Sequence, residues 1–98
     1  MEVQFWSDLY DRLETDARFF GSFPSSVVTA YRKRLQQIRN ATYERDLYAL
    51  KSLRFEKLKG GRSHQYSMRL NDQWRLILES HGKGTEKVII IIGIEDYH

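Results

Sequence analysis

Hydrophobic residues recur with two different periods along this chain. In the first half they recur every three or four residues, which is the spacing of an amphipathic α-helix. This spacing predicts a helix that begins after Ser7, a second helix over residues 24–40, and a short third helix over residues 42–50. Ser7 is a favourable N-cap residue, and Pro24 fits the first turn of the second helix.

Apolar and polar residues alternate in the second half, which is the period of a β-strand. The alternation predicts strands over residues 53–59, 64–70 and 74–79. Residues 86–92 are almost continuously aliphatic, which predicts a central strand covered on both faces. Residues 2–6 also alternate and are expected to form a short edge strand.

Together these elements predict a single domain over residues 1–98 with an α+β fold. We expect two N-terminal helices, plus the short third one, to pack on one face of a small antiparallel sheet. A chain of 98 residues is long enough to bury one hydrophobic core without disulfides.

The register of the predicted hairpin follows from its hydrophobic positions. A three-residue connection over residues 71–73 pairs Leu70 with Trp74 and Met68 with Leu76, so that one face of the hairpin is apolar. A two-residue turn would mix apolar and charged side chains on both faces. We therefore predict the three-residue connection.

The same register sets Arg69 opposite Arg75 on the polar face. Like charges that face each other across two strands repel, so this pair indicates a surface that binds an anion such as phosphate. Seven basic residues and only two acidic ones, Glu56 and Asp72, lie between residues 51 and 75, although the whole chain carries a net charge of only +3. The sequence pI of about 9.3 also favours a polyanionic partner.

Basic side chains also follow one side of the second predicted helix: Arg32, Lys33, Arg34 and Arg39. Two interpretations are open for this side. It is either a helix exterior that faces solvent, which we favour, or a second contact with RNA.

Composition argues against several other kinds of site. The chain has no cysteine, so neither disulfides nor thiolate metal sites are possible. Its three histidines lack the spacing of metal ligands and no nucleotide-binding glycine motif is present, so we expect neither a metal nor a cofactor. The longest apolar run, residues 88–92, is far shorter than the roughly 20 residues of a membrane span, and the N-terminus does not resemble a signal peptide. A cytoplasmic location is therefore expected.

Four short motifs give the chain a recognisable pattern. They are Leu-Lys-Gly at residues 58–60, Tyr-Ser-Met-Arg at 66–69, Asn-Asp-Gln-Trp-Arg-Leu at 71–76, and Glu-Asp-Tyr-His at 95–98. In this order they resemble the RelE superfamily of bacterial toxins, and most closely its HigB-type branch. The resemblance implies a ribosome-dependent endonuclease that cleaves mRNA in the A site of the 70S ribosome. It also implies a cognate HigA-type antitoxin, expected to be a helix-turn-helix DNA-binding protein, that keeps the toxin inactive.

Family resemblance implies roles for four basic side chains. Lys59 and Arg75 match the family's basic positions and would hold the scissile phosphate, with Arg75 stabilising the charge of the transition state. Arg69 would assist or hold a neighbouring phosphate. Arg62 lies in the turn after Lys59, and we expect it to contact ribosomal RNA or nothing.

Acid–base roles are implied for the C-terminal motif and for one glutamate. His98 matches the final histidine of the HigB-type ending and is expected to act as general acid, while Tyr97 and Asp96 orient it or the substrate. Glu56 departs from the closest branch, where a histidine is common, and resembles the general base of the YoeB-type branch. Glu56 and His98 would then form a base–acid pair on two neighbouring strands; alternatively, Glu56 only neutralises the cations around it.

Three other functions remain open from the sequence. A ParE-type toxin has the same fold and poisons DNA gyrase without nuclease chemistry, although the histidine ending and the Lys59 and Arg75 set fit a nuclease better. A plain RNA-binding module would use a basic sheet without turnover, but the fingerprints of the common modules are missing. A degenerate toxin would fold and bind its antitoxin without activity.

Overall fold

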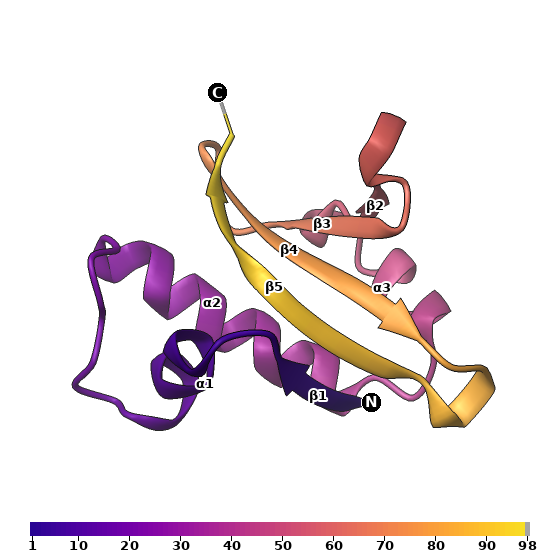
Figure 1. The fold of residues 1–98 in the computed structure, drawn as a ribbon, viewed down its shortest axis with the longest axis horizontal. Helices are drawn as coiled ribbons and strands as arrows, with labels where there is room; N and C mark the ends of the chain where they lie inside the picture. Colours follow the sequence, from indigo (N-terminus) through magenta and orange to yellow (C-terminus); the bar gives the residue numbers. More distant parts are fainter. Residues whose placement is uncertain (98) are drawn as a thin grey trace.

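The computed structural model describes residues 1–97 and contains three α-helices and a five-stranded sheet (Figure 1). The helices are α1 (Asp8–Thr15), α2 (Ser25–Asn40) and α3 (Glu44–Ala49). The strands are β1 (Glu2–Phe5), β2 (Glu56–Lys57), β3 (Gln65–Arg69), β4 (Trp74–His81) and β5 (Val88–Asp96). The predicted N-cap is confirmed, because the side chain of Ser7 accepts a hydrogen bond from the backbone N–H of Leu9.

The strands lie in the order β1-β5-β4-β3-β2. β2 to β5 pair in antiparallel fashion, as predicted, and β1 is an edge strand as expected. β1 differs from the prediction in its direction, because it runs parallel to β5 and makes the sheet mixed. The connection from β1 to β5 passes through all three helices and three strands, which leaves β1 free to lie beside β5 in either direction.

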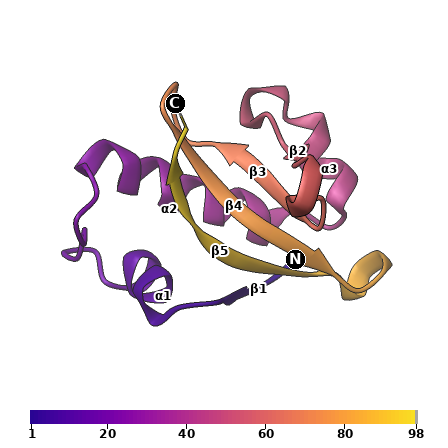
Figure 2. The same ribbon diagram turned by 45° about the horizontal axis from the view of Figure 1, so that its top comes forward.

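All three helices contribute to a layer on one face of the sheet, and α2 crosses behind β4 and β5 (Figures 1 and 2). The apolar stripe of α2 packs against aliphatic side chains that the strands direct toward it. From α2 these are Val27, Val28, Tyr31, Leu35 and Ile38, and from the sheet they include Met68, Leu76, Leu78, Ile89 and Ile91. No helix in the described residues is long and apolar enough to cross a membrane.

The prediction that the aliphatic strand is covered on both faces is wrong. Ile89 and Ile91 of β5 are fully buried against the helices, whereas Ile90 and Ile92 are only half-buried on the other face. The reason is that the sheet has a single helical layer, so every second side chain of β5 points away from it. We call this second face the open face.

The predicted hairpin register is confirmed. Met68 pairs with Leu76 and Arg69 with Arg75, and the backbone N–H of Leu70 donates to the carbonyl of Trp74 at 3.0 Å. Asn71 stabilises the three-residue connection, since its Oδ1 atom accepts hydrogen bonds from the backbone N–H groups at residues 73 and 74, both at 2.8 Å.

The strand predicted over residues 53–59 is shorter than expected. Leu53 ends a 3-10 turn, and Arg54 adopts a left-handed conformation with φ of 48°, which interrupts the extended backbone. Only Glu56 and Lys57 pair with β3, although Leu53 and Phe55 are both buried in the core. The alternation of apolar side chains in this segment therefore predicted which residues are buried, but it did not predict the length of the strand.

The register between β4 and β5 shifts at one point. Ile77 pairs with Gly93 but Leu78 pairs with Ile91, so β5 has one extra residue there. At this bulge the hydroxyl of Tyr10 accepts a hydrogen bond from the backbone N–H of Ile94 at 3.2 Å. Beyond the bulge, Glu95 pairs with Arg75 on the open face.

The basic side of α2 is not simply a solvated exterior. Three of its arginines bind groups elsewhere in the protein: Arg32 donates to backbone carbonyls at the end of α1 and in the loop after it, Arg34 donates to the carbonyl of Arg69, and Arg39 binds the carboxylate of Glu14. These contacts join α2 to α1 and to the sheet. They also leave these three side chains less available for the alternative contact with RNA.

Candidate active site

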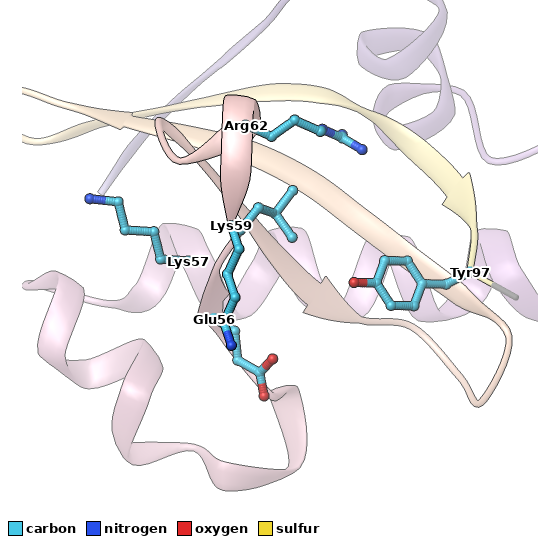
Figure 3. Close-up of a pocket in the computed structure, with 6 residues that line it drawn as sticks. Glu56, Lys57, Lys59, Arg62 and Tyr97 are labelled. Atoms are coloured by element: carbon cyan, nitrogen blue, oxygen red, sulfur yellow. The ribbon is translucent and has the colours of Figure 1, made fainter.

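A cavity of about 450 Å³ lies on the open face (Figure 3). It is bounded by β2, by the 3-10 turn over Gly60–Arg62, and by the end of β5. Its lining consists of Glu56, Lys57, Leu58, Lys59, Arg62 and Tyr97. Four of these residues were predicted from the sequence as site residues.

Glu56 reaches this cavity because of the pleat of β2, and Lys59 lines it from the segment that follows the strand. Glu56 pairs with Ser67, whereas Lys57 pairs with Tyr66, whose ring packs against the core. Successive side chains point to opposite faces, and in Figure 3 the ammonium of Lys57 extends away from Tyr97. Glu56 and Lys59 are exposed and form no ion pair or side-chain hydrogen bond with another described residue.

Arg75 is held in place beside the cavity. Its Nη1 atom donates to the carbonyls of Asn71 at 2.6 Å and Trp74 at 3.2 Å. Its guanidinium carbon lies 5.1 Å from the centre of the Tyr97 ring, a cation–π contact. The hairpin loop and the C-terminal end of β5 thus fix the arginine that was expected to stabilise a phosphate.

The facing pair of Arg69 and Arg75 is relieved inside the protein. Arg69 forms an ion pair with Asp72 in the hairpin loop, while Arg75 uses loop carbonyls as acceptors. The two guanidinium groups therefore have separate partners, and the pair does not by itself require a bound anion. This weakens the argument that like charges at these positions indicate phosphate binding.

Tyr97 and Asp96 are fixed by the same loop. The backbone N–H of Tyr97 donates to the carbonyl of Gln73 at 2.6 Å, and the side-chain amide of Gln73 donates to Asp96 at 3.1 Å. The side chain of Tyr97 remains half-exposed toward the cavity. His98, the predicted general acid, lies outside the described residues.

Arg62 was expected to contact ribosomal RNA or nothing; within the protein it binds the carboxylate of Glu95. Its Nη1 and Nη2 atoms donate to the two carboxylate oxygens of Glu95, at 3.0 and 2.7 Å, and this bond raises the pKa of Arg62 above its usual value. Sequence reasoning missed Glu95. Its position opposite Arg75 could have indicated a role in the site. However, the bulge in β5 shifts the pairing by one residue, and the sequence pattern does not predict this shift.

The predicted base–acid pair assumed that Glu56 and the C-terminal end of β5 lie on neighbouring strands. The structure shows that they do not. β3 and β4 lie between β2 and β5 in the sheet. The cavity nevertheless brings Glu56 and Tyr97 to one site, with the hydroxyl of Tyr97 pointing toward β2 (Figure 3). No group of three or more potential metal-ligating side chains is found in the described part of the chain.

Comparisons with known proteins show the family and the fold of the chain. The family model for RelE-like toxins of type II toxin–antitoxin systems, HigB, matches residues 4–98. The fold is similar to that of a YoeB/ParE toxin from Agrobacterium tumefaciens, with a TM-score of 0.59 and 19% sequence identity over 100% of both chains. At this identity the likeness concerns the fold alone. No curated protein sequence matches the chain significantly.

Proposed function

The chain belongs to the HigB-like family of RelE-like toxins of type II toxin–antitoxin systems, and from this premise we propose that it is a ribosome-dependent mRNA endonuclease. In this proposal it cleaves mRNA in the A site of the 70S ribosome and so arrests translation. An antitoxin partner follows from the family itself; that this antitoxin is HigA-type, with a helix-turn-helix domain, is part of the proposal. So is a cytoplasmic location.

The observation that carries this proposal is the cavity on the open face. It joins a carboxylate, Glu56, to an ammonium, Lys59, and it opens beside the guanidinium of Arg75 and the ring of Tyr97. Cleavage of RNA by its own 2′-hydroxyl requires a base, an acid and cations that stabilise the negative charge on phosphorus oxygens. The cavity brings a carboxylate together with cationic side chains, which supports the proposal.

In the proposed reaction, the 2′-hydroxyl of one nucleotide attacks the adjacent phosphorus. Glu56 accepts the proton of this hydroxyl, and the bond from phosphorus to the 5′-oxygen of the next nucleotide breaks. The products are a 2′,3′-cyclic phosphate and a free 5′-hydroxyl, whose proton comes from His98. Lys59 and Arg75 neutralise the phosphorane, and Arg75 suits this role because its side chain is already oriented by the hairpin loop.

Arg69 and Asp96 are proposed to act at the edge of the site. Arg69 is next to Arg75 across the hairpin and could hold a neighbouring phosphate if the RNA displaces Asp72. Asp96 accepts a hydrogen bond from the side-chain amide of Gln73, which restrains the backbone next to Tyr97.

Primer extension on mRNA from cells that briefly express the protein tests this function. We expect cuts within translated codons, absent with Arg75→Ala and His98→Ala, because loss of one transition-state donor costs roughly 10²- to 10³-fold in rate. Glu56→Gln should lower the rate without abolishing it, since the ribosome still positions the RNA. Circular dichroism and co-purification with the antitoxin show that each variant is folded. Intact mRNA together with arrested growth and a DNA-damage response would instead indicate a gyrase poison.

A further inference from the structure

Arg62 connects two strands that are not neighbours. It donates two hydrogen bonds to Glu95 on β5, at 3.0 and 2.7 Å, and its Nε atom donates to Oε1 of Gln65 on β3, at 3.1 Å. β4 lies between β3 and β5 in the sheet. The side chain of Arg62 therefore crosses over β4 on the open face.

Ile77 marks the place where Arg62 crosses. Gln65 pairs with Glu79 of β4, and Glu95 pairs with Arg75 of β4. Ile77 lies midway between these two residues of β4. Ile77 is fully buried and its neighbour Ser67 is 4% exposed, although the helices cover only the opposite face. A guanidinium that reaches from Gln65 to Glu95 passes over this row, in keeping with the burial of both residues.

The turn that carries Arg62 has few other attachments. Gly60 adopts a left-handed conformation with φ of 70°, and no atom lies within 4 Å of the position that a Cβ would take at Gly60 or Gly61. The nearest backbone bond to the sheet runs from the N–H of Leu58 to the carbonyl of Gln65, at 2.9 Å. Beyond Leu58, the turn is held to the sheet mainly by the side chain of Arg62.

We propose that Arg62 and Glu95 form a clasp that holds the Gly60–Arg62 turn against the open face and thereby builds one wall of the cavity. Glu95 is the positioning residue of this clasp. It neutralises Arg62, so that Lys59 and Arg75 supply the net positive charge of the site. Three of the five N–H groups of Arg62 are used, which leaves two that can bind ribose or phosphate oxygens. That last consequence rests on the proposed function, but the clasp itself does not.

Limited proteolysis with trypsin tests the clasp without any RNA. Trypsin cleaves after lysine and arginine only where the side chain and its backbone can leave the protein surface. We expect Glu95→Gln to speed cleavage after Arg62 about threefold to fivefold, as befits the loss of a well-formed but half-exposed ion pair. Arg62→Lys should have a similar effect, because lysine cannot form the two parallel hydrogen bonds.

A matched control is available in the helical layer. Arg39 and Glu14 form an ion pair of the same kind, with hydrogen bonds of 2.8 and 2.7 Å between α2 and α1. Glu14→Gln should leave cleavage after Arg62 unchanged. If Glu95→Gln and the unmodified protein are cleaved at the same rate, or if Glu14→Gln is cleaved as fast as Glu95→Gln, the clasp is wrong.

Kinetics on programmed ribosomes then test what the wall contributes. A wall contact binds substrate and transition state equally, so Glu95→Gln should raise KM about threefold to fivefold while kcat stays the same. A lower KM would contradict the proposal, because it would mean that Arg62 acts better as a free cation. If the unmodified protein cleaves no RNA, the proposed nuclease function fails, and the trypsin result still decides the clasp.

Discussion

Two lysines that are close in sequence have different surroundings. Lys57 and Lys59 are both exposed basic residues of the same cationic stretch, and neither forms an ion pair with another described residue. Both residues line the cavity, but the pleat of β2 directs the ammonium of Lys57 away from Tyr97 (Figure 3). The two side chains carry the same charge, but they differ in orientation.

We therefore expect Lys59→Ala and Lys57→Ala to differ in cleavage rate. Removing the Lys59 ammonium should slow single-turnover cleavage on programmed ribosomes roughly 10²-fold, because one charge that stabilises the phosphorane is lost. Lys57→Ala removes the same charge two residues away, where the ammonium points away from Tyr97, and should change the rate by less than about twofold. Equal losses in the two variants would show that the stretch acts by its total charge.

Among the elements, α2 has a larger structural role than its amphipathic pattern suggests. Arg32 donates to the carbonyls of Leu13, Asp16 and Phe19, at distances of 2.8, 3.1 and 2.9 Å. These carbonyls belong to the last turn of α1 and to the loop that follows, where no further helical N–H is available to bind them. One arginine of α2 thus fixes the end of α1.

Arg32→Ala should accordingly destabilise the protein by about 2–3 kcal/mol, because it leaves partly buried carbonyls without a charged donor. Lys33 is the next residue of the same helix, is exposed and has no ion pair within the described chain, so Lys33→Ala should cost less than about 0.5 kcal/mol. Urea unfolding of both variants measures the difference. Similar free energies of unfolding would contradict this role of Arg32.

The molecule as a whole separates stability from chemistry by face. The helical layer and the buried side of the sheet contain the core, and the open face contains the charged side chains of the site. A second charged group occupies the other end of the open face, where Nε2 of His81 lies 2.9 Å from the carboxylate of Glu79 and Nε2 of His64 lies 3.8 Å from it. The hydrogen bond with His81 lowers the pKa of Glu79.

Folding stability should therefore depend on pH through Glu79. A carboxyl group whose pKa is lowered by folding contributes stability that is fully present above its ordinary pKa near 4.5 and is lost as pH falls through the lowered value. Glu79→Gln has no such group, so its stability should fall less steeply below pH about 4.5. Thermal unfolding of both proteins between neutral and acidic pH measures this. Parallel curves would show that Glu79 does not contribute.

Local patterns determined a large part of this fold. The helical periods, the Ser7 cap and the register that sets Arg69 opposite Arg75 all depend on residues close together in the chain, and all are found as predicted. The four short motifs, taken in their order along the chain, also indicated the family, which the match over residues 4–98 supports. The short β2 was predicted less well, because alternation there reflects burial and not strand pairing.

Tertiary structure decided the remaining features, because each depends on residues that are distant in sequence. The parallel pairing of β1, the bulge opposite Ile77 and the open side of β5 follow from which elements meet in space. The same holds for the cations: Arg32, Arg39 and Arg62 are bound to groups at least 13 residues away, while Lys59 is not. The sequence alone identified a basic surface and its family. Only the folded chain shows which of those charges are already neutralised and which still face the cavity.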